Sequence, residues 1–334
     1  MKMLNYWRSV RNGIFLSVLS IALLFCTHSP VLLAQQVAAS SSEKPNKTEA
    51  AYVRVEDAIY GRKFGTALTM DVFTPKQRAN GRGIIFVVSG GYFSSKEMIH
   101  PAVIRPFLEG GYTVFAVLHG CQPRYQVPEI IQDMRRSVRL IRHHAKDYGV
   151  DPEALGATGG SAGGNLSLLL GTTGDAGNIE AKDPVEREPG RVKAVACFFP
   201  PTDFLNWGGP GKERIHPTDF EKPFRSSFDY LERNEETDLY DRGRAPEKLR
   251  ELTRSILPIY FISKETVPAL VIHGDEDKLV PLQQSQTFVE KLKTAGVPAK
   301  LIVKKGRGHG WPDNAEDLRQ CVEWFDEYLI GKKN

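Results

Sequence analysis

A serine framed by glycines is the residue of this chain best suited to nucleophilic chemistry. Ser161 lies in the run Gly159-Gly160-Ser161-Ala162-Gly163, between a predicted strand and a predicted helix. Glycines two positions before and after a serine permit a sharp strand-to-helix reversal, which exposes the hydroxyl at the positive end of a helix dipole. A serine that only caps the helix is the alternative. A dinucleotide cradle is less consistent with the run, because that pattern requires glycine where Ser161 stands.

A nucleophilic serine needs a base and an acid that orients the base, and both residue types follow in the chain. His309 is flanked by glycines in a loop after the last predicted strand. Asp275 and Asp277 lie in an acidic loop within residues 271–281, which also follows a strand. The order serine, aspartate, histidine is that of a known catalytic triad. The spacing leaves open which aspartate is the acid, and His273 is a rival base that we interpret as structural.

The oxyanion formed by attack on a carbonyl needs hydrogen-bond donors. The backbone N–H of Ala162, next to the nucleophile, is one candidate. The loop Ser89-Gly90-Gly91-Tyr92 follows an early predicted strand and is able to expose further N–H groups. An ordinary Gly-Gly turn is the alternative for this loop.

Strands and helices must alternate if these loops are to meet at one edge of a sheet, and the hydrophobic pattern predicts this alternation. The predicted elements are a hairpin at 52–60 and 66–74, strands at 83–89, 112–118, 155–158, 192–199, 268–273 and 299–303, and helices at 101–109, 128–148, 162–170, 285–295 and 315–329. Continuous apolar strands alternating with helices indicate an α/β fold with a mostly parallel sheet of about eight strands, covered by helices on both faces.

Residues 200–267 interrupt the alternation, since connections in such folds usually have about 2–6 residues. The segment is charged but rich in aromatic side chains. These are Phe204, Trp207, Phe220, Phe224, Phe228, Tyr230 and Tyr240. We interpret the segment as a lid over the carboxyl ends of the strands, where open α/β sheets bind ligands. A decorative helical insertion is the alternative.

The N-terminus has the layout of a secretory signal peptide. Residues 1–34 contain basic but no acidic residues, an apolar run at 14–26 and small residues near candidate cleavage sites after Ala34 and Ala39. An uncleaved membrane anchor is the alternative. Residues 35–50 are polar and predict a flexible leader, so residues 51–334 form one catalytic domain. We expect a secreted or periplasmic protein with no stable membrane insertion after cleavage.

Composition and charge exclude several classes of function. The chain of 334 residues is 41% hydrophobic and 25% charged, which is ordinary for a soluble globular protein. Removal of residues 1–34 lowers the net charge from +4 to +1 and leaves no basic block, so we expect no nucleic-acid partner. The remaining cysteines Cys121, Cys197 and Cys321 show no metal-site spacing, so we expect no metal and no organic cofactor. Whether two of them form a disulfide stays open.

Residues 159–163, the HGDEDKLVP run at 273–281 and the GHGW run at 308–311 together resemble the α/β-hydrolase superfamily. The chain is most similar to esterases and lipases of the hormone-sensitive-lipase-like and feruloyl-esterase-like (BD-FAE) groups, from about residue 52 to the C-terminus. The family pattern H-G-x-x-D-x-x-V-P implies Asp277 as the acid. Relatives usually carry His-Gly-Gly where this chain has Ser89, and the resemblance implies Gly91, Tyr92 and Ala162 as the oxyanion donors.

The resemblance implies a secreted serine hydrolase of carboxylic esters, in which Ser161 attacks, His309 transfers the proton and Asp277 orients the histidine. The substrate would be a small-molecule or sugar-linked ester, with an aryl or acyl group against the aromatic insertion. A serine peptidase similar to prolyl oligopeptidase is one alternative, although the segment before Tyr52 is short for that family's propeller. A catalytically silent hydrolase fold used for binding is the other. The sequence carries no signal for an oligomeric state.

Overall fold

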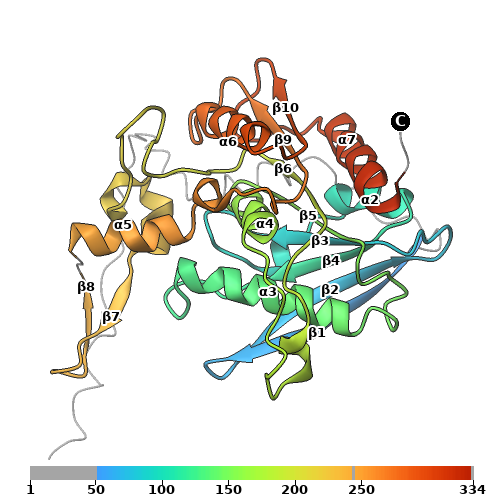
Figure 1. The fold of residues 1–334 in the computed structure, drawn as a ribbon, viewed down its shortest axis with the longest axis horizontal. Coiled ribbons are helices and arrows are strands. Elements are labelled where there is room, and N and C mark those ends of the chain that lie inside the picture. The colour runs from blue at the N-terminus through green and yellow to red at the C-terminus, as the bar shows by residue number, and fades with distance from the viewer. Residues whose placement is uncertain (1–50, 243–244, 332–334) are drawn as a thin grey trace, which may run out of the picture. The chain divides into compact units, whose positions relative to one another are not determined.

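An eight-stranded sheet organises the residues that the structure, a computed structural model, describes: 51–242 and 245–331 (Figure 1). The strand order is β1-β2-β4-β3-β5-β6-β9-β10. The strands are β1 (Tyr52–Lys63), β2 (Thr66–Pro75), β3 (Gly83–Val88), β4 (Thr113–Leu118), β5 (Leu155–Gly160), β6 (Ala194–Phe198), β9 (Ala269–Gly274) and β10 (Ala299–Lys304). In this sheet, β2 pairs antiparallel with both β1 and β4, and all other pairs are parallel. The predicted mostly parallel sheet is confirmed.

Helices cover both faces of the sheet. They are α2 (Pro101–Glu109), α3 (Val127–His143), α4 (Ala162–Thr172), α6 (Gln283–Thr294) and α7 (Ala315–Phe325). Side chains of α3, α4 and α6 pack in one hydrophobic core, and those of α2 and α7 pack in a second core on the opposite face. The alternation of strand side chains produces these two cores. In β4, for example, Phe115 and Val117 join the first core, while Val114 and Ala116 join the second.

Three helix ends differ from the prediction. Helix α3 stops at His143 and gives way to turns that end at Gly149, whose φ is +66°. Helix α4 continues through Gly171 to Thr172. The glycine serves close packing and does not end the helix, since a Cβ there would lie 2.9 Å from Val267 and 3.0 Å from Val195. The final helix changes after Phe325 into a π-helical turn at Asp326–Ile330.

The insertion between β6 and β9 has its own short elements. They are the 3₁₀ turns η3 (Pro217–Asp219), η4 (Lys222–Phe228) and η5 (Pro258–Phe261), the hairpin of β7 (Leu231–Arg233) and β8 (Tyr240–Arg242), and helix α5 (Pro246–Ser255). The β7–β8 hairpin was not predicted. Helix α5 and this hairpin lie together at the left in Figure 1.

Two further predictions from the sequence concern membranes and thiols. The signal peptide (1–34) and the leader (35–50) lie outside the described residues. Within the part that the structure describes, no helix combines the length and hydrophobicity needed to cross a membrane. Cys121, Cys197 and Cys321 are all free thiols, so none of these three pairs with another.

Candidate active site

The strand-to-helix turn after β5 holds Ser161 in a conformation that few residues adopt. Its φ of 54° and ψ of −120° are unfavourable for any residue with a side chain. The two framing glycines are sterically required. A Cβ on Gly159 would lie 2.7 Å from the carbonyl of Gly163, and a Cβ on Gly163 would lie 2.7 Å from the carbonyl oxygen of Val87. Only glycine therefore fits on both sides of the reversal, and Ser161 at its apex is partly exposed.

The Ser161 hydroxyl is directed to a histidine and not to its own helix. Its side chain makes no capping hydrogen bond to α4, so the helix-cap alternative is not realised. Its Oγ lies 2.9 Å from Nε2 of His309, and Nδ1 of His309 lies 2.7 Å from Oδ2 of Asp277. A carboxylate only accepts, so Nδ1 carries the proton and Nε2 accepts from Ser161. The structure thus brings together the serine, the histidine and one of the two aspartates.

Four donors surround the carboxylate of Asp277. Oδ1 accepts from the backbone N–H groups of Leu279 and Val280, at 2.9 and 2.8 Å, while Oδ2 contacts His309 and also lies 3.2 Å from Nε2 of His273. Burial alone would raise the pKa of Asp277, but hydrogen bonds from His273 and His309 hold that pKa well below its ordinary value. Asp277 is therefore ionised at neutral pH.

The other candidates in this loop have different partners. Asp275 is exposed, and its Oδ1 accepts from the N–H of Gly306 at 2.7 Å. His273 is fully buried, and its Nε2 donates to the carbonyl of Val280 at 2.9 Å, while its Nδ1 lies 2.6 Å from the hydroxyl of Ser285. His273 thus faces the acid and does not contact Ser161, which agrees with its interpretation as structural.

The loop after β3 forms a tight turn with two free donors. Gly90 and Phe93 exchange both backbone hydrogen bonds at 2.9 Å, and the central residues Gly91 and Tyr92 have φ of 57° and 64°. Positive φ at both central positions is typical of a type I′ turn. Among the described residues, the N–H groups of Gly91 and Tyr92 have no recorded partner, and neither has that of Ala162, the first residue of α4. All three residues line the same pocket as Ser161.

A buried histidine from outside this loop, His119, supports the turn. Burial lowers the pKa of His119 to about 4, so the ring is neutral. Its Nδ1 donates to the carbonyl of Gly120 at 2.7 Å, which leaves Nε2 to accept from Ser89 at 2.8 Å. The backbone N–H of His119 donates to the hydroxyl of Ser94 at 3.2 Å. His119 therefore ties both ends of the loop. His119 directly follows β4, the strand beside β3. This position at the carboxyl end of a neighbouring strand was the signal in the sequence that could have placed His119 near the loop.

The pocket beside Ser161 has a volume of about 50 Å³, and aromatic side chains of the insertion form much of its wall. They are Phe204, Trp207, Phe220, Phe224 and Phe228. Arg214 lies 5.0 Å from the ring of Trp207 and 4.8 Å from that of Phe220, and it pairs with Glu221 at 3.1 Å. The insertion thus lies against the nucleophile. Two other predicted aromatics, Tyr230 and Tyr240, do not line this pocket.

With this geometry established, the comparisons with known proteins identify the family. The model of the BD-FAE family matches residues 70–292. The chain belongs to the BD-FAE family. The match includes the elbow at Ser161, the loop of Asp277 and the insertion, while His309 follows the matched region.

Relatives of this BD-FAE member include mycobacterial esterases. The chain is 28% identical to a probable carboxylic ester hydrolase, LipM, of Mycobacterium tuberculosis, over 72% of this chain and 52% of that protein. It is 26% identical to the esterase LipQ of the same organism, over 86% of this chain and 65% of that one. The chain therefore spans about half to two thirds of the length of these relatives.

Solved structures show the same fold. A truncated carbohydrate esterase from gut microbiota superimposes with a TM-score of 0.68 at 24% identity, over 85% of this chain and 99% of that one. At this level of identity the likeness establishes the α/β-hydrolase fold of the BD-FAE member and carries no information about its substrate.

Phe199, which sequence reasoning missed, packs on the histidine of this BD-FAE member. Its ring centroid lies 4.5 Å from that of His309, and it also contacts Trp311. Phe199 directly follows β6 at a φ of 36°. The Phe-Phe-Pro-Pro run at 198–201 was the available signal, since a strand that ends in such a run turns sharply at the carboxyl edge of the sheet.

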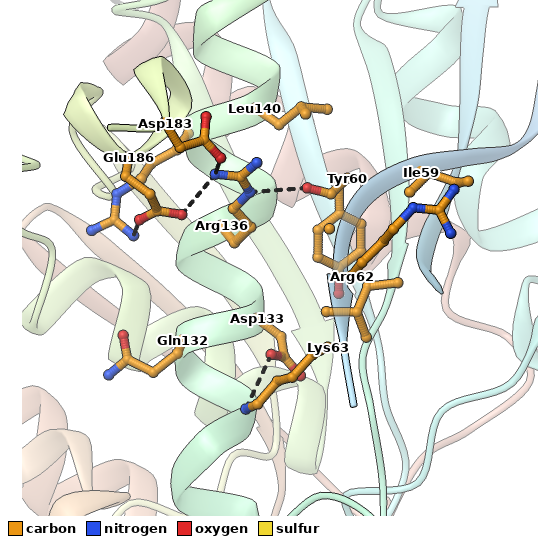
Figure 2. A pocket seen from close by; sticks show the side chains of 13 residues that line it. Ile59, Tyr60, Arg62, Lys63, Gln132, Asp133, Arg136, Leu140, Asp183 and Glu186 are labelled. Atoms are coloured by element: carbon orange, nitrogen blue, oxygen red, sulfur yellow. Dashed lines mark hydrogen bonds and ion pairs between the residues drawn. The ribbon is translucent and has the colours of Figure 1, made fainter. Parts of the chain in front are cut away.

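A larger cleft, of about 670 Å³, lies between β1 and α3 and contains none of the predicted site residues (Figure 2). Its charged side chains pair with one another. Arg136 contacts Asp183 at 2.7 Å and Glu186 at 2.8 Å, and Lys63 lies 3.8 Å from Asp133. Across the described residues, no cluster of three or more His, Cys, Asp or Glu side chains is arranged to hold a metal ion.

Proposed function

We propose that this protein is a serine hydrolase of carboxylic esters that acts through an acyl-enzyme. The observation that carries the proposal is the continuous hydrogen-bonded chain from Ser161 Oγ through His309 to Asp277, at 2.9 and 2.7 Å. The names of the mycobacterial relatives, a carboxylic ester hydrolase and an esterase, support the choice of an ester as substrate.

The proposed reaction follows from the protonation states in the site. Nε2 of His309 takes the proton as Ser161 Oγ attacks the ester carbonyl, and the charged imidazolium is stabilised by the ionised Asp277. His309 then gives that proton to the leaving alcohol, and the acyl group remains on Ser161. Water deprotonated by His309 attacks the acyl-enzyme, and the acid is released with Ser161 restored.

The negative oxygen of the tetrahedral intermediate would be held by backbone donors. The N–H groups of Gly91, Tyr92 and Ala162 line the pocket of Ser161 and have no other recorded partner among the described residues. Such donors stabilise the charge without reorganising, because the turn and the helix hold them in place before reaction.

The aromatic wall supports an ester with an apolar or aryl group on one side. Residues 200–267 would act as a lid, because their aromatic rings line the pocket of Ser161. The carbohydrate esterase from gut microbiota shares this fold, so sugar-linked esters belong in a substrate panel. We further propose that residues 1–34 are a signal peptide that directs export of the protein. N-terminal sequencing of the mature protein tests whether they are removed.

Hydrolysis of p-nitrophenyl acetate by the purified protein tests this function. The wild type should turn the ester over, and Ser161→Ala should reduce kcat by roughly 10⁴-fold or more, down to background. Covalent labelling by a fluorophosphonate probe distinguishes an active serine from a silent fold. Aminoacyl-proline amides assayed in parallel distinguish an esterase from a peptidase. Turnover that survives intact in Ser161→Ala would refute the mechanism.

A further inference from the structure

A hydroxyl of the insertion contacts the turn that carries the proposed oxyanion donors. Oγ of Ser227, in η4, donates to the carbonyl of Gly91 at 2.6 Å, across a separation of 136 residues. Ser227 is 1% exposed, so water does not compete for this bond. Two rings of the same segment flank the contact: Phe224 lies against the Cα of Gly91, and Phe228 packs edge-on against Tyr92 at 5.6 Å.

The carbonyl of Gly91 belongs to the same peptide unit as the N–H of Tyr92. In a trans peptide, which this bond is, these two groups lie in one plane and point in opposite directions. A hydrogen bond that fixes the carbonyl therefore also fixes the direction of the N–H. It polarises the peptide as well, which makes the N–H a stronger donor.

The turn itself does not fix this central peptide. Its two hydrogen bonds join Gly90 and Phe93, and the bond to the Gly90 carbonyl already holds the peptide that carries the Gly91 N–H. The Gly91–Tyr92 peptide takes no part in either bond. Rotation of a turn's central peptide is the local motion that costs such a turn least, since the flanking hydrogen bonds persist. Among the described residues, Ser227 is the recorded partner of this peptide.

We propose that Ser227 is a positioning residue of the oxyanion hole: from the insertion, it holds the Gly91–Tyr92 peptide so that the Tyr92 N–H faces the developing oxyanion. The inference rests on the proposed ester hydrolysis and deepens it. It gives the insertion a part in catalysis besides that of covering the pocket.

Ser227→Ala tests the inference, with Ser226→Ala as the matched control, because Ser226 is the exposed neighbour in the same 3₁₀ segment. Loss of a whole oxyanion donor costs about 10²–10³ in kcat, and a donor that is present but free to turn should cost about tenfold. We expect kcat/KM for p-nitrophenyl acetate to fall about tenfold in Ser227→Ala and to stay unchanged in Ser226→Ala.

Two inhibitors separate positioning from a purely structural tether. Phenylboronic acid forms a tetrahedral adduct with the serine, so its inhibition constant should rise by the same factor as kcat/KM falls. Ethyl 4-nitrophenyl ether has the shape of the substrate without its carbonyl oxygen, so its inhibition constant should not change. Ser227→Cys preserves the size of the side chain with a weaker donor, and it should show the same pattern if Ser227→Ala does not fold.

The outcomes are distinguishable. A wild type without esterase activity overturns the proposed function, and this inference with it. An active wild type matched by an equally active Ser227→Ala overturns only the role of Ser227. Equal weakening of both inhibitors, or a lower melting temperature with unchanged kcat/KM, would show a tether and would also overturn that role.

Discussion

Replacement of Asp277 by asparagine is the sharpest test of how the site works. Both carboxylate oxygens face donors only: His309 and His273 at Oδ2, and the N–H groups of Leu279 and Val280 at Oδ1. Asparagine keeps the size of the side chain but turns one acceptor into an NH₂ group. In either orientation of the amide, that group meets two donors.

The rigid backbone pair decides the orientation. If the amide oxygen stays with Leu279 and Val280, the NH₂ group faces Nδ1 of His309 and forces the other tautomer. Nε2 then carries a proton and has no lone pair for Ser161. A wrong tautomer of this kind lowers kcat by about 10³–10⁴, which corresponds to about 4 to 5.5 kcal/mol in the activation barrier. The opposite orientation keeps the tautomer but leaves two buried N–H groups without acceptors, which costs stability instead.

The measurement is kcat/KM for p-nitrophenyl acetate, with thermal unfolding recorded for each variant. Asp275→Asn is the matched control, since Asp275 lies two residues away and is exposed, and its side chain accepts from the turn at Gly306. We expect Asp275→Asn to remain within about threefold of the wild type, as surface changes usually do. An Asp277→Asn variant that keeps more than a tenth of the activity, or an equal loss in both variants, would refute this reasoning.

Two further predictions concern the turn and the cleft. Gly91→Ala would place a Cβ 2.4 Å from Cδ1 of Phe224 at a φ of +57°, so kcat/KM should fall by more than about tenfold. Gly296 also has a positive φ, +75°, but open space surrounds it, so Gly296→Ala should leave kcat/KM unchanged. Burial raises the pKa of Asp133 to about 6, although Lys63 lies nearby (Figure 2). The value in the unfolded chain is 3.8. The native state therefore binds more protons than the unfolded state between these values, so the free energy of unfolding falls as the pH rises from about 4 to 6. Asp133→Asn should remove up to about 3 kcal/mol of this loss of unfolding free energy. Urea unfolding of the wild type and of Asp133→Asn at pH 4 and pH 7 measures it. The prediction is wrong if the difference in unfolding free energy between the two proteins is the same at both pH values.

The sheet was largely predictable because its signal is local. Strands buried on both faces appear as continuous apolar runs, and each helix shows its own period, so most elements lie within a few residues of their predicted bounds. The errors arose where packing between elements decides. The helix predicted to end at residue 170 includes Gly171, where two valines from other elements leave no room for a side chain, so this glycine serves packing and does not mark the helix end. The β7–β8 hairpin carries three residues per strand and shows too little alternation to be recognised.

The candidate site likewise contains residues that the sequence predicts and residues that only the folded structure reveals. The glycines around Ser161 and His309 encode their own backbone geometry, so these positions stand out in the sequence. The aspartates at 275 and 277 have the same chemistry and nearly the same place, so their spacing does not separate them. The family pattern implies Asp277, and in the folded loop it is Asp277 that contacts His309. His119, Phe199 and Ser227 show no local motif, because each acts on a residue from another strand or from the insertion.

The amino-acid sequence by itself determined the reversal at Ser161, the order of nucleophile, acid and base, and the alternation that builds a parallel sheet. These features depend on residues close together in the chain, where sterics and side-chain period act directly. Only the tertiary structure decided which groups surround the carboxylate of Asp277, what supports the oxyanion turn and which rings line the pocket. Those contacts join residues up to 136 positions apart, and their geometry depends on how the strands and the insertion pack together.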